Sequence, residues 1–241
     1  MSGPQPSPTG GASAGQPASA SRPLVLGVPG ASGAIYAVRL LEQLVAAGRD
    51  VHLILSPSGQ AVLLQELGVR CDWQRPDPQV LLEAAHTSPL LRRSGESAAP
   101  IARAATEPAT AGRVIAHRYD DFMAPVASGS FLTGGMVICP CSGSTLSGIA
   151  HATGDNLIHR AADVHLKERR RLILVPRETP LSVIQLDNMR RAAEAGAVVL
   201  PAMPGWYHGV SSIADLVDFV VARILDQLEV PHTLVRRWGE S

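Results

Sequence analysis

Charged side chains concentrate in residues 159–182, HRAADVHLKERRRLILVPRETPLS, around one apolar run. Arg160 and Lys167 are seven residues apart, so a helix would place them on one face. Arg177 and Glu178 follow the apolar run and stand between two prolines. A guanidinium binds phosphate with two hydrogen bonds, an ammonium ion stabilises a leaving group, and a carboxylate can move a proton. The segment therefore indicates chemistry at a phosphate.

Two segments rich in glycine and serine each follow an apolar run and precede a helical pattern. They are GVPGASGA, residues 27–34, and CPCSGSTLSGIA, residues 139–150. Free N–H groups and hydroxyls at a helix N-terminus bind anions. Tight strand-to-helix packing explains the first segment equally well, and an ordinary serine N-cap explains the second. On neighbouring strands, the pair would suit a ligand with a phosphate at one end and a polar heterocycle at the other.

Aromatic residues occupy one further segment, PAMPGWYHGV, residues 201–210. The hydroxyl of Tyr207 is suited to binding phosphate, and the indole of Trp206 to stacking on a flat ring. His208 is a candidate base, although most loop histidines are simply solvated. The eight histidines show no metal-ligand spacing, and the only close cysteine pair has no second pair to match it. We therefore expect no metal site.

Hydrophobic patterning indicates the elements that must position these residues. Short runs that are apolar at nearly every position predict buried parallel strands; they lie at 24–28, 51–55, 136–140, 171–176 and 197–201. Helical patterns lie between them at 34–47, 58–67, 142–150, 155–169, 180–195 and 211–228. This alternation predicts an α/β fold with a doubly wound parallel sheet and helices on both faces. Such sheets bind ligands at the carboxyl ends of their strands.

Composition limits the class of protein. The chain has 241 residues, 46% of them apolar and 17% charged, which suits a single domain, here residues 23–230. Residues 1–22 predict a disordered tail, residues 70–118 a partly flexible insertion, and residues 231–241 a C-terminal tail. The zero formal charge argues against a nucleic-acid partner, and no apolar run is long enough to cross a membrane. An odd count of three cysteines indicates a reducing compartment, the cytoplasm.

Four segments together resemble the UbiX-type flavin prenyltransferases: GASGAIYAVRLLE, CPCSGSTLSGIA, RAADVHLKERRRLILVPRETPL and GWYHGVSSIADLVDFVVARILDQL. The resemblance covers residues 23–68 and 119–230 and implies a flavodoxin-like Rossmannoid fold that binds FMN. It also implies a homo-oligomer, usually a dodecamer. Such enzymes join a dimethylallyl group, from dimethylallyl phosphate or pyrophosphate, to N5 and C6 of reduced FMN without a metal. Their product, prenylated FMN, is the cofactor of UbiD-type decarboxylases.

The resemblance also implies site residues. FMN would contact Gly30, Ala31, Ser32, Ser56, Ser142, Gly143, Ser144, Thr145 and Arg177. The prenyl phosphate would contact Arg160, Lys167, Tyr207 and Arg223, with Trp206 where relatives often carry another aromatic residue. Catalysis would involve Ser32 close to the reacting ring, Lys167 at the leaving phosphate, Glu178 in proton transfer and Glu66 as a second acid.

Two alternatives remain open. FMN-dependent cysteine decarboxylases share the implied fold and a serine-rich helix start, but their late loop resembles P-A-M-N where this chain has Pro204. A non-catalytic FMN-binding protein is the other. It would have no use for a leaving-group clamp, and this chain retains Lys167, Arg177, Glu178 and Tyr207 together.

Overall fold

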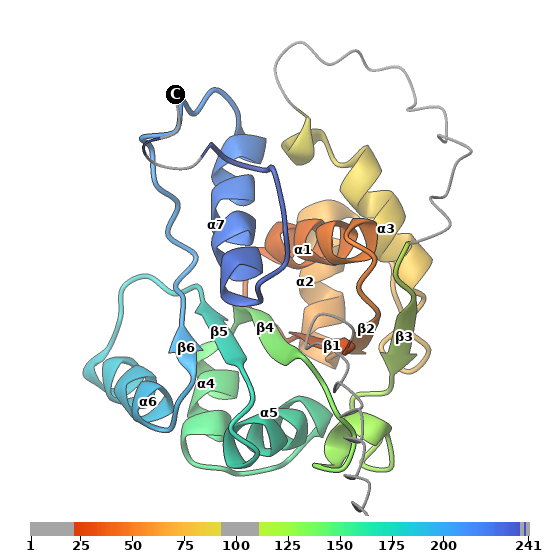
Figure 1. The fold of residues 1–241 in the computed structure, drawn as a ribbon, viewed down its shortest axis with the longest axis vertical. Helices are drawn as coiled ribbons and strands as arrows, with labels where there is room; N and C mark the ends of the chain where they lie inside the picture. The colour runs from red at the N-terminus through yellow and green to blue at the C-terminus, as the bar shows by residue number, and fades with distance from the viewer. Residues whose placement is uncertain (1–21, 93–110, 237–238, 240–241) are drawn as a thin grey trace, which may run out of the picture.

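The computed structural model describes residues 22–92, 111–236 and 239. Within these ranges, six parallel strands form one sheet in the order β3-β2-β1-β4-β5-β6. Helices α1, α2, α3 and α7 lie on one face, and α4, α5 and α6 lie on the other (Figure 1). This confirms the doubly wound α/β fold. The predicted tail at residues 1–22 lies outside the described residues, except for Arg22.

The strands and helices have the following bounds. The strands are β1 (Leu24–Val28), β2 (Val51–Leu55), β3 (Val114–His117), β4 (Gly135–Cys141), β5 (Leu172–Pro176) and β6 (Val198–Val199). The α-helices are α1 (Ala34–Ala46), α2 (Pro57–Leu67), α3 (Pro78–Thr87), α4 (Gly143–Ala150), α5 (Leu157–Lys167), α6 (Val183–Glu194) and α7 (Ile213–Gln227). Two short 3-10 turns, η2 (Pro89–Leu91) and η3 (Pro125–Ala127), complete the described elements.

The core lies in two layers, one on each face of the sheet. Every residue of β1, β2, β4 and β5 is buried. Successive strand residues point to opposite faces, so Leu24 and Leu26 pack with α1 and α7, whereas Val25 packs with α4 and α5. This is why the central strands read as continuous apolar runs rather than as alternating ones.

The strand order reverses between β1 and β4, which lie side by side. From β1 the chain continues to β2 and β3 on one side, and from β4 it continues to β5 and β6 on the other. The connections after β1 and β4 therefore diverge, and in open α/β sheets the carboxyl ends of two such strands are where ligands bind. The two glycine-serine segments of the sequence follow these two strands, as expected.

An α-helix, the 3-10 turn η2 and a strand fall within the predicted insertion and were not expected. Asp77 is the N-cap of helix α3, and its side chain accepts a hydrogen bond from the N–H of Gln79; the helix buries Leu81 in the core. Strand β3 pairs with β2 and forms one edge of the sheet. Residues 93–110 of the insertion lie outside the described part. Within the predicted C-terminal tail, Leu234 packs against the core.

A buried histidine makes stability depend on pH. His165, only 1% exposed on α5, bonds through Nδ1 to the carbonyl oxygen of Ala161 (2.7 Å) and through Nε2 to Oγ1 of Thr133 (2.8 Å). Burial, with a smaller contribution from the charge of Arg170, lowers the pKa of His165 from its ordinary 6.5 to about 4. The unfolded chain therefore binds more protons between pH 6.5 and 4. The contribution of neutral His165 to the free energy of unfolding is fully present above pH 6.5 and is lost as the pH falls towards 4.

We expect this histidine to contribute on the order of 2 kcal/mol to the loss of stability between pH 7 and pH 4. His52 is also shifted to about 4, by burial and by His117, and adds to the same loss. Urea unfolding of His165→Asn should show a weaker loss over this interval than the wild type does. The exposed His151→Asn is the control and should follow the wild type. Equal losses in the two variants would contradict the assignment.

Candidate active site

The turn after β1 leads into α1, and a carboxylate from another part of the chain binds the N–H groups at the start of this helix. Gly33 is the N-cap of α1 and has a φ of 108°, a backbone conformation that favours glycine. The half-buried carboxylate of Glu66, on α2, accepts hydrogen bonds from the N–H groups of Gly33 and Ala34, both at 2.9 Å. The sequence predicts an anion at this turn, and in the structure the chain itself supplies one. A ligand phosphate would have to displace Glu66 to bind these two amides.

The same turn packs tightly on the start of α2. A Cβ at Gly30 would lie 2.3 Å from Cβ of Ser58, so only glycine fits there. Ser56 is buried; its N–H donates to the carbonyl oxygen of Val28, and its hydroxyl caps α2 by accepting from the N–H of Gly59 (2.9 Å). The predicted FMN contact at Ser56 is thus a residue whose hydroxyl already has a structural partner.

We expect Gly30→Ala to lower the free energy of unfolding by about 1–3 kcal/mol, because the added methyl group overpacks this contact. The double variant Gly30→Ala with Ser58→Gly removes the opposing Cβ and should recover most of the loss. Ser58→Gly alone is the control. Urea denaturation measures all three, and a double variant no more stable than Gly30→Ala would contradict the proposed contact.

The turn after β4 offers an anion-binding helix start. Ser142 caps α4: its Oγ accepts from the N–H of Thr145 (3.3 Å), lies 2.9 Å from Oγ1 of Thr145 and lies 3.1 Å from Oγ of Ser144. Among the described residues, no recorded hydrogen bond uses the N–H groups of Gly143 or Ser144. The capping explanation is therefore correct for Ser142, while two amides and the exposed hydroxyl of Ser144 remain for an anion.

Arg177 connects the end of β5 to the turn after β1. Its Nε donates to the carbonyl oxygen of Ser32 at 3.0 Å. Glu178, the next residue, is exposed; its carboxylate accepts from the N–H of Thr179 (3.2 Å) and from Nε2 of Gln185 (3.3 Å). The structure therefore gathers most of the predicted flavin and acid residues at one edge of the sheet: Gly30, Ala31, Ser32, Ser56, Glu66, Ser142, Gly143, Ser144, Thr145, Arg177 and Glu178.

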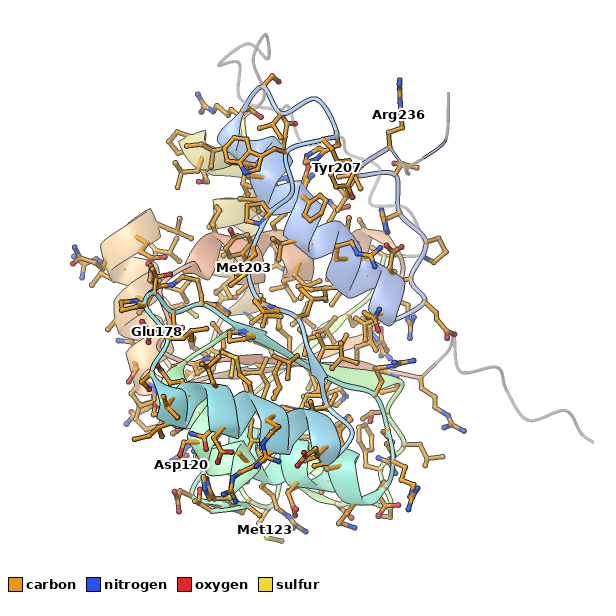
Figure 2. All side chains as sticks on the ribbon, turned by 90° about the vertical axis from the view of Figure 1, so that its left-hand side faces the viewer. Asp120, Met123, Glu178, Met203, Tyr207 and Arg236 are labelled. Carbon is orange, nitrogen blue, oxygen red and sulfur yellow. The ribbon has the colours of Figure 1, made fainter. Side chains whose placement is uncertain are left out.

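A second group of predicted residues lies along α7. The ring of Tyr207 packs edge-on against the rings of Phe219 and His208. Arg223, one helical turn after Phe219, forms an ion pair with Asp226 and lines a hollow of about 290 Å³ between β6 and α7. Trp206 is 70% exposed. Figure 2 shows Tyr207 near the upper end of α7, with Met203 between it and Glu178.

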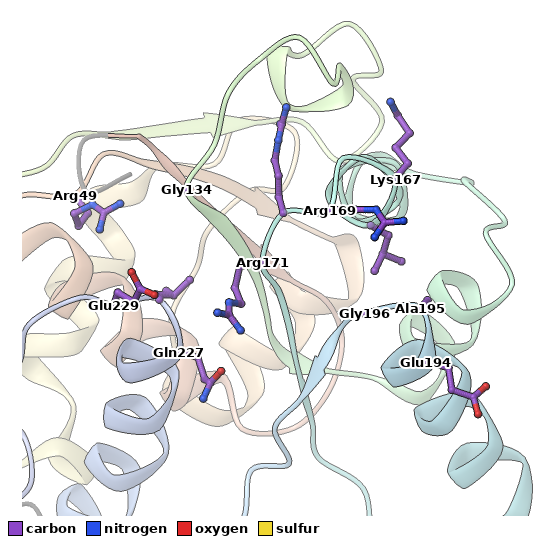
Figure 3. Close-up of a pocket in the computed structure, with 13 residues that line it drawn as sticks. Arg49, Gly134, Lys167, Arg169, Arg171, Glu194, Ala195, Gly196, Gln227 and Glu229 are labelled. Carbon is purple, nitrogen blue, oxygen red and sulfur yellow. The ribbon is translucent and has the colours of Figure 1, made fainter. Parts of the chain in front are cut away.

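Lys167 lies at the opposite edge of the sheet. It ends α5, β5 begins only five residues later, and Glu178 follows the far end of β5. Lys167 is exposed, pairs with Glu168 at 2.6 Å, and lines a hollow of about 880 Å³ at the amino ends of the strands. Figure 3 shows it around this hollow together with Arg171 and Gly196. Within one chain, the structure does not bring Lys167 to Glu178 or to Tyr207.

Arg160 also forms its hydrogen bonds with residues other than the predicted site residues. Its Nε donates to the carbonyl oxygen of Ala127, and its Nη1 pairs with Asp163 at 3.0 Å. Among the described residues, no recorded hydrogen bond links it to the carboxyl edge of the sheet. The four residues expected to hold the prenyl phosphate are therefore divided between α5 and the neighbourhood of α7.

The cysteines are structural. Cys139 and Cys141 are buried free thiols at the end of β4, as expected, and burial raises the pKa of both, that of Cys141 to about 12. In the described part of the chain, no three His, Cys, Asp or Glu side chains are placed to hold a metal ion. None of its helices is both long and apolar enough to span a membrane.

Besides the contact of Glu66 with the start of α1, two contacts at the carboxyl edge were not anticipated. Ser58 faces Gly30, and Gln185 bonds to Glu178. The signal for Gln185 is present in the sequence, since S-x-x-Q at 182–185 is a capping box that starts a helix. That pattern fixes where α6 begins, but it does not show that the glutamine also reaches the preceding strand end.

Fold and site define the chain as a flavoprotein: the family model described as Flavoprotein matches residues 13–225. The flavin prenyltransferase UbiX of Pseudomonas aeruginosa is 45% identical over 220 residues, which cover 90% of this chain and 94% of that protein. The chain belongs to the UbiX flavin prenyltransferase family.

Solved structures agree with this assignment. AnUbiX, solved in complex with FMN and dimethylallyl pyrophosphate, is 34% identical with a TM-score of 0.73, and the match covers 92% of this chain and 99% of that one. A dodecameric FMN-dependent UbiX-like decarboxylase from Escherichia coli is 34% identical with a TM-score of 0.70, over 90% of this chain and 99% of that one. By contrast, a PPC decarboxylase at 14% identity and a TM-score of 0.50 shares the fold alone.

Proposed function

We propose that the protein is a flavin prenyltransferase that joins a dimethylallyl group to N5 and C6 of reduced FMN. The observation that carries the proposal is the meeting of Ser32, Arg177 and Glu178 at the carboxyl edge of the sheet, beside the open start of α4. This edge combines an anion-binding turn, a guanidinium and a carboxylate, which are the groups that a flavin phosphate and a proton transfer require. Membership of the family supports the same reaction.

The arrangement of charges supports one orientation of FMN. Glu66 already occupies the amides at the start of α1, whereas the amides of Gly143 and Ser144 are open. The flavin phosphate would therefore bind at the start of α4, with Ser142 and Thr145 fixing that turn. The ring system would then lie along residues 30–32, close to Ser32. Nη1 and Nη2 of Arg177, for which no hydrogen bond is recorded among the described residues, would also reach the ligand.

Glu178 would move the protons of the reaction. The allylic carbon–oxygen bond breaks, the phosphate leaves, and carbon–nitrogen and carbon–carbon bonds form at N5 and C6. N5 and C6 each lose a proton; the departing phosphate takes up one and the prenyl chain the other, so the flavin gains C5H8. An exposed carboxylate at this position is suited to transferring protons between these atoms. Cationic groups around the phosphate, with Tyr207, would stabilise its developing charge.

We further propose that the phosphate clamp is completed between copies of this chain. Lys167 lies at the edge of the sheet opposite Glu178, and Arg160 is bound to Ala127 and Asp163, so a neighbouring copy would have to present them. The dodecameric state of the UbiX-like neighbour supports a homo-oligomer, probed below by mixing variants. Trp206, Tyr207 and Arg223 would join the clamp from α7. Residues 23–230 would form the flavin-binding domain.

The product would be prenylated FMN, and its recipient a UbiD-type decarboxylase. Reduced FMN is oxidised readily, and the buried thiols are free, so we propose the reducing cytoplasm as the site of action. Neither a metal nor a nucleic acid enters this scheme.

Release of the leaving group tests the proposed reaction. Anaerobic protein is mixed with dimethylallyl phosphate or dimethylallyl pyrophosphate, and released phosphate or pyrophosphate is measured with reduced FMN, oxidised FMN or no flavin. The proposal predicts release only with reduced FMN, and the faster donor identifies the natural one. Release that does not depend on flavin would indicate a phosphatase and would contradict the proposal, as would no release from either donor.

A further inference from the structure

Gln185 connects the start of α6 to Glu178. It belongs to a capping box in which Oγ of Ser182 accepts from the N–H of Gln185 (3.2 Å) and Oε1 of Gln185 accepts from the N–H of Ser182 (2.8 Å). Its Nε2 donates to Oε2 of Glu178 at 3.3 Å. One amide group therefore caps a helix with its oxygen and binds a carboxylate with its nitrogen.

The two contacts require the same orientation of the amide. The N–H of Ser182 needs an oxygen acceptor, and the carboxylate of Glu178 needs an N–H donor. Exchanging the amide oxygen and nitrogen of Gln185 would place donor against donor at one end and acceptor against acceptor at the other. The hydrogen-bond network therefore determines which atom faces Glu178.

Gln185 also lies against the anion-binding turn. Its Nε2 is 3.1 Å from the point where a Cβ at Gly143 would lie, so the first residue of α4 leaves just enough room for the amide. Gln185 therefore stands between the start of α4 and Glu178. A displacement of α6 would therefore move this amide relative to both the start of α4 and Glu178.

We propose that Gln185 is a positioning residue that holds the carboxylate of Glu178 beside the flavin turn; this inference rests on the proposed function. Each oxygen of Glu178 has one donor, Thr179 N–H on Oε1 and Gln185 Nε2 on Oε2. Without these bonds an exposed glutamate samples many rotamers. The other charges at this edge have different partners: Arg177 donates to Ser32, and Glu66 binds the start of α1.

Gln185→Glu tests the role of the amide without removing the helix cap. The glutamate keeps an oxygen for the N–H of Ser182, since S-x-x-E is an equally good capping box. At Glu178, however, it replaces a donor by a negative charge. We expect turnover to fall about tenfold at pH 7, and the limb of the pH–rate profile that depends on Glu178 to move to higher pH by about one unit. The melting temperature should stay unchanged, and turnover is compared at saturating FMN, because a negative charge beside Gly143 would also weaken binding of the flavin phosphate.

Ser182→Ala is the matched control. It removes the other half of the capping box and lowers the stability of α6, by about 1 kcal/mol, but leaves Gln185 Nε2 on Glu178. A positioning role predicts that Ser182→Ala keeps the wild-type pH profile although it is less stable. If Gln185→Glu keeps the wild-type profile and turnover, or if both variants change in parallel with their stability, the inference is wrong.

Carbon-13 NMR separates this inference from the proposed function. The side-chain carboxyl signal of Glu178, assigned by its absence in Glu178→Gln, is titrated in the wild type and in Gln185→Glu. A higher titration midpoint in Gln185→Glu supports the contact whether or not the wild type prenylates flavin. Identical midpoints would overturn it. Failure of the wild type to turn over, with a shifted midpoint, would instead count against the proposed reaction.

Discussion

Glu178→Gln is expected to lower turnover by about 10²–10⁴-fold, the usual range for loss of a positioned acid or base. Glutamine has the same shape and can still accept from the N–H of Thr179, but it cannot give or take a proton. The side chain is exposed at a strand end, so the fold should not change. Turnover is measured as leaving-group release under anaerobic conditions, and FMN affinity by fluorescence titration.

FMN affinity should stay within about twofold of the wild-type value, because the phosphate and ring contacts lie on other residues. Glu194→Gln is a suitable control: Glu194 is the last residue of α6, is exposed and pairs with Arg190. Turnover of Glu178→Gln close to that of this control would remove Glu178 from the mechanism. Parallel losses of turnover and FMN binding would indicate that it holds the ligand instead.

The second large effect concerns Lys167 and the division of the site between copies. Lys167→Ala is expected to lower turnover by about 100-fold or more, since a cation that stabilises a leaving phosphate contributes several kcal/mol to the transition state. Co-expression of Lys167→Ala chains with Glu178→Gln chains should nevertheless restore activity. In a mixed oligomer, about one quarter of the sites would combine an intact Glu178 from one chain with an intact Lys167 from a neighbour.

The mixing experiment distinguishes a site shared between chains from a site within one chain, because each variant alone is expected to be nearly inactive. Separately purified variants, mixed without exchange of subunits, serve as the control and should stay inactive. If both residues act in the same chain, every site of the mixed oligomer lacks one of them and no activity returns. Activity in the mixed oligomer equal to the sum of the two variants would therefore contradict the shared site.

Much of the fold could be predicted because the sheet is covered on both faces. The buried strands at 24–28 and 51–55 match β1 and β2 in full, since every residue there is apolar or packed. The edge strand β3 was missed because it is short and none of its residues is fully buried. Helix α3 was missed within a polar segment, although Asp77 followed by Pro78 is a typical helix start.

The carboxyl edge of the site could be predicted because parallel strands end together. The turns after β1, β4 and β5 had to converge there once the sheet was recognised. The capping role of Glu66 could not be predicted, since it depends on α2 returning to the start of α1 over more than thirty residues. Local sequence patterns do not predict a contact between residues so far apart in the chain.

Closeness in sequence does not bring Lys167 and Arg177 together within one chain. Lys167 and Arg177 lie in one charged segment, but α5 runs to the amino edge of the sheet and β5 returns to the carboxyl edge. A helix followed by a strand must reverse direction, so residues at the end of one and after the end of the other lie at opposite edges. The segment therefore supplies two separate surfaces, which only an oligomer could join.

The mass of the flavin is the most direct test of the proposed activity. Purified protein is incubated anaerobically with reduced FMN and dimethylallyl phosphate or pyrophosphate, and the extracted flavin is analysed by mass spectrometry. The account predicts a flavin heavier by one C5H8 unit, formed with the wild type and not with Glu178→Gln. Unmodified flavin with both donors, from protein that binds FMN tightly, would contradict it.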